Sequence, residues 1–209
     1  MKKAIVVDLD GTLLRTNTFV HYIKYVCKKA LLHGNVFVVI WICLLVFLRK
    51  IRMISSHEKL KRRILACSKQ YSKEDNMQEL ALELSKYENL KVLSIMDIYK
   101  EKGYAVVLSS AAPEGYAEWI AKQYMFDFVC ATKMSVNSDW RENVGEEKKQ
   151  NTQSLLEENA LTLSVLITDH NDDLPLLRID KEANFVVNPT EETKKRIEES
   201  RIKCEYIYG

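Results

Sequence analysis

The 209-residue sequence contains few of the residues that interrupt regular structure, with only six glycines and three prolines. Its five cysteines are widely spaced and form no CxxC pair, so neither a zinc site nor a redox-active pair is expected. Net charge is nearly absent: 31 basic residues against 29 acidic ones leave +2, too little for the broad positive field of a non-specific nucleic-acid binder. We therefore expect no nucleic-acid partner. Because disorder requires low hydrophobicity and high net charge, a chain with 47% hydrophobic residues is expected to be ordered.

The beginning of the chain lacks the apolar region of a secretory signal. Only Ala4 to Val7 separate Lys2 and Lys3 from Asp8, and this stretch is too short for a signal peptide. We therefore expect a cytoplasmic protein. Its length, against roughly 150 residues per domain, predicts one large domain or a core with a smaller inserted domain.

One unbroken apolar segment, residues 36–48, tests the expectation of a cytoplasmic protein. It is flanked by basic residues on both sides, namely Lys28, Lys29, Arg49, Lys50 and Arg52. As a helix it would rise about 20 Å, short of the ~30 Å hydrocarbon core, so it should not span a membrane. Our first interpretation is a helix buried inside a helical domain. Peripheral contact with a membrane surface or an apolar substrate, and a dimer interface, are the alternatives.

Strand and helix patterns alternate in the two outer parts of the sequence. Strands are predicted at 4–7, 105–108, 128–131, 163–167 and 185–187, and helices at 113–124 and 145–158. Residues 18–93 differ, because they contain no glycine after Gly34, no proline, and helical periodicity. The sequence therefore predicts an α/β protein. Its Rossmann-like three-layer core with a mainly parallel sheet comprises residues 1–17 and 94–209, and an all-helical domain, 18–93, is inserted.

Polar residues follow three of the predicted strands, where ligands bind in open parallel sheets. Asp8 and Asp10 come directly after the first strand, and two adjacent carboxylates require a cation or a shared proton. Residues 109–113, Ser-Ser-Ala-Ala-Pro, follow the second strand and open a helix, which suits an anion. Lys148 begins a later helix, and residues 168–173 add acids after a further strand.

Each of these features has a purely structural explanation when taken alone. An aspartate at a strand end often caps a helix, and a lysine in a helix is usually solvated. The same holds for the basic residues 59–63, normally a solvated helix face, with contact to a substrate anion as the alternative. In this order along the chain, however, they supply a nucleophile, metal ligands and a phosphate clamp.

The constellation resembles the haloacid dehalogenase-like superfamily of phosphohydrolases. Its first motif, a hydrophobic strand followed by DxDGT, is matched fully by residues 8–12. The second motif places a hydroxyl after a strand. Ser110 fits it better than Ser109, because small residues follow Ser110.

The last two motifs of this superfamily also have counterparts. The third is a lone lysine, matched by Lys148 with Lys149 as the alternative, and the fourth is an acid pair, matched by Asp169 and Asp173 before Leu-Pro. The resemblance spans the core, and the helical insertion looks like the cap of the phosphoserine-phosphatase-like branch.

The resemblance implies a phosphomonoester phosphatase that works through a phosphoaspartate. It assigns Asp8 as the nucleophile, Asp10 as the general acid and base, and Ser110 and Lys148 as phosphoryl-binding catalytic residues. Mg²⁺ is the implied cofactor. The implied metal site comprises Asp8, Asp10, Asp169 and Asp173. The Asp8 and Asp169 carboxylates and the backbone carbonyl of Asp10 would be ligands, and Asp173 would orient Lys148 or a metal-bound water.

The substrate is expected to be a small phosphorylated molecule bound through Thr12, Ala111 and Asn17. Asn17 stands where phosphoserine phosphatases use a glutamate for the substrate ammonium, which favours an uncharged or apolar phosphomonoester. Two alternatives stay open: a phosphoserine phosphatase, and a catalytically inactive phospholigand-binding protein on the same fold, since Thr168 and His170 are unusual in the fourth motif. A receiver-type phospho-acceptor fits poorly, because its phosphorylated aspartate lies on a middle strand, which here ends in Ser110.

Overall fold

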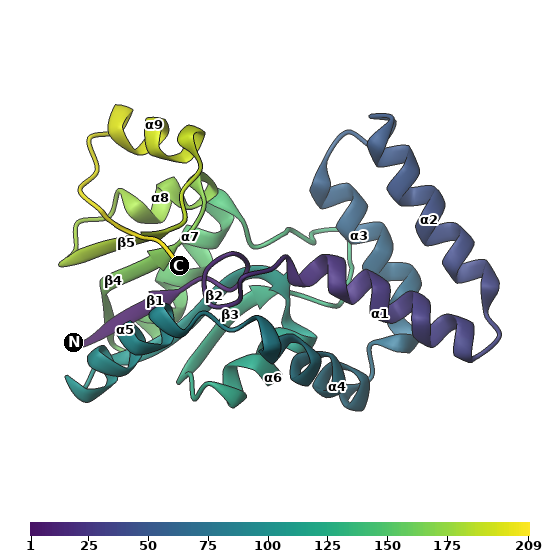
Figure 1. The fold of residues 1–209 in the computed structure, drawn as a ribbon, viewed down its shortest axis with the longest axis horizontal. Helices are drawn as coiled ribbons and strands as arrows, with labels where there is room; N and C mark the ends of the chain where they lie inside the picture. Colours follow the sequence, from purple (N-terminus) through teal and green to yellow (C-terminus); the bar gives the residue numbers. More distant parts are fainter.

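One sheet of six strands, all of them parallel, organises a computed structural model that describes residues 1–209 (Figure 1). The strands lie in the order β3-β2-β1-β4-β5-β6. Their bounds are β1 Lys2–Val7, β2 Ala105–Pro113, β3 Phe128–Thr132, β4 Leu161–Thr168, β5 Ala183–Val187 and β6 Glu205–Ile207. The predicted α/β class with a parallel sheet is confirmed.

The central strand β1 shows why the sheet is covered on both faces. Ile5 and Val7 belong to one hydrophobic cluster, Ala4 and Val6 belong to another, and all four are completely buried. Successive side chains of a strand point to opposite faces, so a continuous apolar run requires a helical layer on each side.

Nine α-helices accompany the sheet. Their bounds are α1 Thr18–Leu32, α2 Val36–Lys50, α3 His57–Ser68, α4 Glu74–Leu84, α5 Leu90–Glu101, α6 Glu114–Gln123, α7 Gly145–Glu158, α8 Leu174–Leu177 and α9 Glu191–Glu199. Helices α7, α8 and α9 contribute Leu156, Leu176 and Ile197 to the cluster on one face of the sheet. Helices α5 and α6 contribute to the cluster on the other face, which gives three layers (Figure 1).

Helices α1, α2 and α3 extend away from the sheet, and we call them the cap helices (Figure 1). The remaining helices of the insertion return to the core, because α4 packs against α6 and α5 packs against β2. The predicted boundary between residues 93 and 94 lies inside α5, which spans Leu90–Glu101. One hydrophobic cluster continues from β1 into the cap helices, and it includes Ile5, Tyr22 and Ile42.

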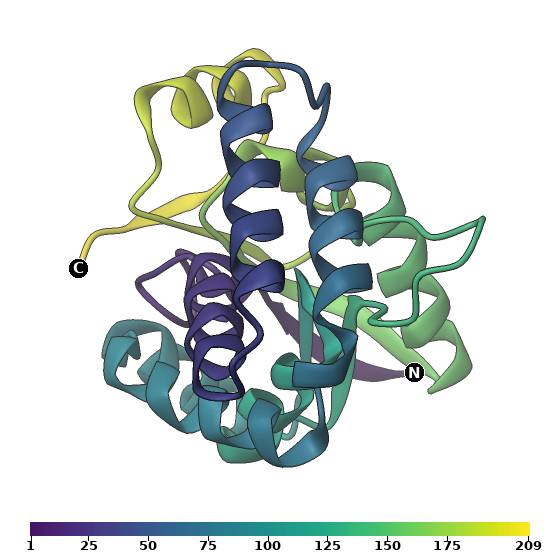
Figure 2. The same ribbon diagram turned by 90° about the vertical axis from the view of Figure 1, so that its right-hand side faces the viewer.

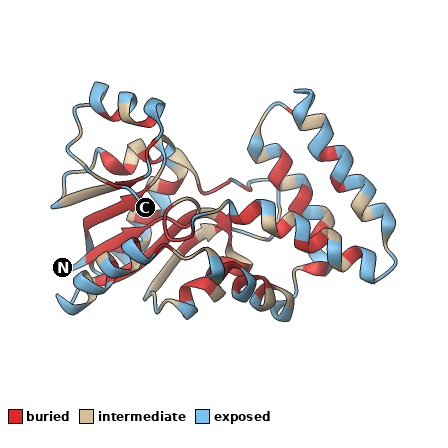
Figure 3. Ribbon diagram, viewed as in Figure 1, coloured by how far each residue is buried: buried red, intermediate tan, exposed pale blue.

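The apolar helix α2 is not buried on all sides. Only Ile42 and Leu45 are fully buried, whereas Phe37 is 84% exposed and Ile40 is 60% exposed. Our first interpretation of the segment was wrong, because only α1 and α3 pack against α2 and nothing covers its outer side (Figures 2 and 3). None of the helices combines the length and the apolar character that crossing a bilayer demands.

Candidate active site

The register of the central strands brings three loops to one edge of the sheet. Val7 pairs with Leu108 of β2 and with Ile167 of β4, so the last residue of β1 lies level with these two residues. The first residues beyond this register are Asp8, Ser109 and Thr168. From β1 the chain adds β2 and β3 on one side, and from β4 it adds β5 and β6 on the other side. Open α/β sheets bind ligands at such a switch point.

A cavity of about 620 Å³ opens at this edge, between the core and the cap helices. Its walls contain most of the residues predicted from the sequence, namely Asp8, Asp10, Asn17, Ser110, Ala111, Lys148, Asp169 and Asp173. Thr12 is the exception among the predicted site residues. It is completely buried and does not line the cavity, and its hydroxyl has no hydrogen-bond partner.

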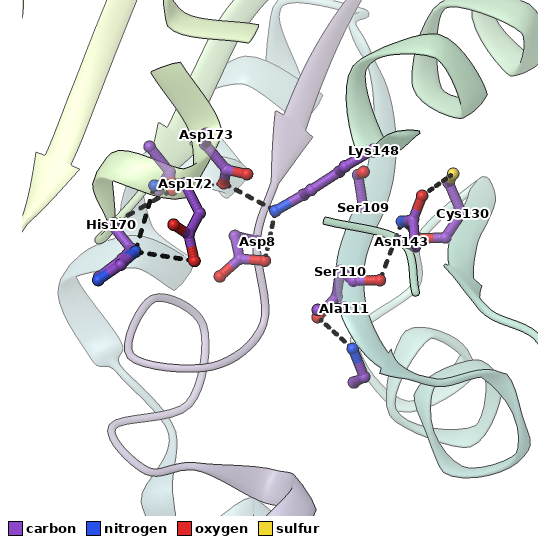
Figure 4. A network of polar contacts seen from close by, with 12 residues as sticks. Asp8, Ser109, Ser110, Ala111, Cys130, Asn143, Lys148, His170, Asp172 and Asp173 are labelled. Carbon is purple, nitrogen blue, oxygen red and sulfur yellow. Dashed lines mark hydrogen bonds and ion pairs between the residues drawn. The ribbon is translucent and has the colours of Figure 1, made fainter. Parts of the chain in front are cut away.

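Lys148 connects the first and fourth motifs (Figure 4). Its Nζ donates to Asp8 Oδ1 at 2.7 Å and to Asp173 Oδ2 at 2.7 Å, and Thr168 Oγ1 donates to the same Asp173 oxygen at 2.6 Å. Burial opposes the charge on Lys148, but the carboxylates of Asp173 and Asp8 outweigh it and raise its pKa. The lysine therefore stays protonated, and its ammonium is held beside Asp8.

The neighbour of Lys148 lies outside the site. Lys149 Nζ donates to Glu146 Oε1 at 3.0 Å on the exposed side of α7, and Lys149 does not line the cavity. Of the two lysines, only Lys148 contacts Asp8.

The two serines of the second motif point in opposite directions. Ser109 Oγ lies 2.7 Å from Thr152 Oγ1 of α7, away from the cavity. Ser110 lines the cavity, and its Oγ accepts from the backbone N–H of Ala112 at 3.1 Å (Figure 4). Asn143 holds this strand end in place by donating from Nδ2 to the carbonyl of Ser110 at 2.9 Å.

Asp10 is anchored by the first cap helix. The backbone N–H of Thr18, at the start of α1, donates to Asp10 Oδ1 at 2.8 Å. Burial raises the pKa of Asp10, although the hydrogen bonds from Thr18 oppose the shift. A raised pKa suits a carboxyl group that must carry a proton to a leaving group.

Asn17 acts as the N-cap of α1. Its Oδ1 accepts from the backbone N–H of Val20 at 3.1 Å, which satisfies one of the free donors of the first turn. Asn17 also lines the cavity, but its oxygen is already engaged by the helix.

Gly11 allows the first and fourth motifs to approach each other. Its φ of +72° lies in the left-handed region, which glycine adopts without strain. The carboxylate of Asp169 lies directly against its Cα, where there is no room for a Cβ atom. Asp169 is thereby placed beside the turn that carries Asp8 and Asp10.

The site holds more carboxylates than its lysine can balance. Burial raises the pKa of Asp8 to about 8 despite the Lys148 ammonium, and the charges of Asp173 and Asp169 add to the shift. Burial and the carboxylate of Asp173 likewise raise the pKa of Asp169 to about 6. A divalent cation would relieve this repulsion, so the donor set fits one.

The oxygens available for such an ion fit Mg²⁺. No three His, Cys, Asp or Glu side chains converge as a ligand group. Magnesium is usually bound through one or two carboxylates and keeps several waters. The Asp8 and Asp169 carboxylates with the Asp10 backbone carbonyl are such a set, whereas Asp173 is engaged by Lys148 and Thr168.

The cap helices supply cavity residues that the sequence did not single out. These are Phe19 of α1 and His57, Glu58 and Lys61 of α3, and the loop before α7 adds Glu142. Lys61 belongs to the basic residues 59–63, and the expectation of a solvated helix face is wrong for it, because Lys61 is buried. Glu58 and Lys61 are three residues apart and share a helix face, but no sequence signal shows that this face meets the core.

Lys61 joins the cap helices to the core. It forms a buried ion pair with Glu142, and its Nζ donates to the carbonyl of Ala111 at 3.1 Å. The Nζ also lies 4.9 Å from the centre of the Phe19 ring. A cation from α3 thus contacts both β2, next to Ser110, and the loop before α7.

Comparisons with known proteins agree with this geometry. The family model described as haloacid dehalogenase-like hydrolase matches residues 5–178. A search of curated protein sequences finds no match.

Several solved structures share the fold. A Bordetella pertussis Tohama I protein of unknown function has a TM-score of 0.78 and 13% identity, with 99% of this chain and 98% of that chain covered. A phosphoserine phosphohydrolase-like protein from Francisella tularensis subsp. tularensis SCHU S4 has a TM-score of 0.58 and 14% identity, covering 98% and 94%. A phospho-aspartyl intermediate analogue of phosphoserine phosphatase has a TM-score of 0.60 and 14% identity, covering 98% and 92%. At these identities the likeness concerns the fold.

Proposed function

Because the chain belongs to the haloacid dehalogenase-like hydrolases, we propose that it is a Mg²⁺-dependent phosphatase that hydrolyses phosphomonoesters through a phosphoaspartate on Asp8. The observation that carries the proposal is the position of Lys148, held between Asp8 and Asp173 at 2.7 Å from each. A buried ammonium beside a carboxylate nucleophile is suited to attract a phosphoryl group and to stabilise it during transfer.

The first step transfers the phosphoryl group from the substrate to the protein. A carboxylate oxygen of Asp8 attacks phosphorus, and the bond between phosphorus and the ester oxygen breaks. Asp10 gives its proton to the departing oxygen, so the alcohol leaves neutral. The hydrogen bond from Thr18 to Asp10 Oδ1 leaves Oδ2 for this proton.

The second step hydrolyses the intermediate. Asp10, now ionised, removes a proton from water, and the water oxygen attacks the same phosphorus. The bond between phosphorus and Asp8 breaks, which releases phosphate and restores both carboxyl groups to their first state.

The residues around Asp8 hold the phosphoryl oxygens. The Ser110 hydroxyl and the Lys148 ammonium face them, and Asp173 with Thr168 keeps the lysine in place. Bound Mg²⁺ would neutralise phosphoryl oxygens and favour the ionised form of Asp8, and its ligands would be Asp8, Asp169 and the carbonyl of Asp10.

The leaving group is proposed to be uncharged or apolar. Asn17 is neutral and its oxygen caps α1, so it offers no charge to an ammonium group. Only Phe19, Ala111 and Val144 are apolar among the residues that line the cavity. The cavity therefore suits the phosphate and nearby polar atoms, and an apolar chain would extend beyond it.

Phosphoserine is the second candidate, and Glu58 is the observation that favours it. This acid lines the cavity from the cap side and has no ion pair, whereas Glu142 is neutralised by Lys61. A substrate ammonium could therefore pair with Glu58 in place of the glutamate missing at position 17.

Phosphate release from a panel of esters tests the function. The panel contains phosphoserine, sugar phosphates, and short-chain prenyl and glycerol-lipid phosphates, each with Mg²⁺ and with excess chelator. We expect Mg²⁺-dependent turnover and a phosphorylated peptide containing Asp8 after acid quenching.

Turnover by Asp8→Asn would contradict the mechanism, and no turnover of any ester would favour the inactive phospholigand-binding protein. A clear preference for phosphoserine, lost on Glu58→Gln, would replace our substrate proposal with the second candidate.

A further inference from the structure

Helix α2 and the residue that follows it, Ile51, expose a continuous apolar stripe on the outside of the cap helices. Its side chains are Phe37, Ile40, Trp41, Leu44, Phe47 and Ile51, and each is at least 40% exposed. They recur every three or four residues, so they lie on one side of the helix. We call these six residues the outer face. The opposite side of α2, with Ile42 and Leu45, is packed against α1 and α3.

The outer face lies on the side of the molecule remote from the sheet. Figure 1 places α2 at the end of the molecule opposite the N-terminus, and Figure 2 shows it in front when that end faces the viewer. Figure 3 colours most of the helix as exposed. No part of this chain covers the stripe.

The chain segment that carries the outer face has charges of one sign only. Between Asp10 and Glu58 the chain contains no acidic residue and seven basic ones. Lys28 and Lys29 of α1 pair with Glu83 and Glu79 of α4. No carboxylate pairs with the three cations at the end of α2, which are Arg49, Lys50 and Arg52.

We propose that the outer face of α2 docks onto the surface of an anionic lipid bilayer, with the helix lying parallel to the membrane plane. A helix that exposes a broad apolar surface and is bordered by unpaired cations is suited to interfacial membrane binding. Phe and Leu side chains enter the boundary between headgroups and acyl chains, and a tryptophan such as Trp41 favours that depth. Lys50 and Arg52 then meet anionic headgroups.

A second copy of the chain fits the same surface less well. In a symmetric dimer the outer face of one copy would contact the outer face of the other. The cations at the end of α2 would then have no acidic partner, because α1, α2 and the loop before α3 contain no acid. An anionic surface supplies the charge that another copy lacks.

The docked orientation places the cavity near the membrane. The loop 51–56 leads from α2 into α3, whose first residues His57 and Glu58 line the cavity. If α2 lies on the membrane, only the loop 51–56 separates it along the chain from the wall of the cavity that His57 and Glu58 form.

Vesicle co-sedimentation of the full-length protein tests the docking surface. Vesicles of phosphatidylcholine alone are compared with vesicles that also contain phosphatidylglycerol, at low and high salt. We expect binding to the anionic vesicles, loss of binding in high salt, and little binding to neutral vesicles. Equal binding to both compositions, or none to either, would overturn the proposal.

Two pairs of variants separate the contributions of the outer face. Phe37→Ser with Phe47→Ser should weaken vesicle binding more than about tenfold, because each side chain loses its apolar contact. Lys50→Gln with Arg52→Gln should weaken it about 30-fold, since each cation contributes roughly fivefold. The matched controls are Leu82→Ser, which changes an exposed apolar side chain of α4, and Lys2→Gln with Lys203→Gln on the core.

Unchanged binding by either test pair would contradict the proposal, as would equal losses in the controls. Circular dichroism verifies that the variants fold, which we expect because the changed side chains are exposed. Light scattering identifies the competing outcome: a dimer that Phe37→Ser and Phe47→Ser dissociate, without vesicle binding, would assign the outer face to a second copy. Asp8→Asn should still bind vesicles, so this test is independent of the proposed phosphatase activity.

Discussion

The Asp169 carboxylate occupies the space that a side chain at position 11 would need. A Cβ atom on Gly11 would lie 2.1 Å from Asp169 Oδ2, and the φ of Gly11 is +72°. Gly11 therefore serves two purposes at once, a left-handed turn after the first motif and direct contact with the fourth.

Gly11→Ala is predicted to destabilise the protein and to remove activity. Strain in the left-handed turn should cost about 1 kcal/mol, and displacement of Asp169 adds to it. Gly34→Ala is the matched control, because Gly34 has a φ of +70° and nothing within 4 Å of its Cβ position. Urea unfolding and kcat measurements compare the two. Equal losses in both variants would show that the contact with Asp169 is unimportant.

Lys148→Met is predicted to lower kcat by about 100-fold or more, because it removes the preorganised charge beside the phosphoryl group. It should also lower the free energy of unfolding by about 3 kcal/mol, since Asp8 and Asp173 lose their buried partner. Lys149→Met, one residue along the same helix, should leave kcat nearly unchanged. Similar kcat values for the two variants would contradict the role of Lys148.

Asp10→Asn is predicted to affect poor leaving groups most. An alkoxide is a poor leaving group and needs a proton as it departs, whereas a phenolate leaves readily without one. We therefore expect a larger fall in kcat/KM for alkyl phosphates than for aryl phosphates. A uniform fall would argue that Asp10 positions the site and does not transfer the proton.

Asp169→Asn is predicted to raise the Mg²⁺ concentration that gives half-maximal activity. The amide keeps the shape of the side chain but removes one negative charge from the proposed ligand set. Titration of activity with Mg²⁺ measures the shift, with Asp180→Asn as a control outside the cavity. An unchanged Mg²⁺ requirement would remove Asp169 from the ligand set.

The buried pair between Lys61 and Glu142 should behave as a coupled unit. Lys61→Met or Glu142→Leu alone leaves one charge buried without its partner, which should cost about 3–5 kcal/mol. The double variant should be more stable than either single variant, because neither charge remains. Chemical unfolding of all four proteins measures the coupling, and additive losses would contradict it.

Much of the core could be predicted, because it depends on local patterns. The apolar run before Asp8 and those before Ser110 and Thr168 are strands, and the helix predicted at 145–158 has the bounds of α7. The later elements α8, α9 and β6 were missed. Strand β6 covers only Glu205–Ile207 at the edge of the sheet, and such a short edge strand leaves little pattern to detect.

The site itself divides in the same way. Asp8, Lys148 and Asp173 follow strands or begin helices, so the topology alone brings them together. Phe19 and Lys61 belong to the cap helices, and their place in the cavity depends on how those helices are oriented. The prediction that α2 is buried was wrong for a related reason, because composition does not reveal how many neighbours a helix has.

The hydrogen bond from Thr18 to Asp10 makes the proposed acid sensitive to cap position. Thr18 is the first residue of α1, so a hinge movement that lifted the cap helices would pull this donor from the carboxyl group. Asp10 would then lose its orientation at the moment when solvent enters. Closure over a substrate and alignment of the acid would thus be a single event, and an open enzyme would be unable to protonate a leaving group prematurely.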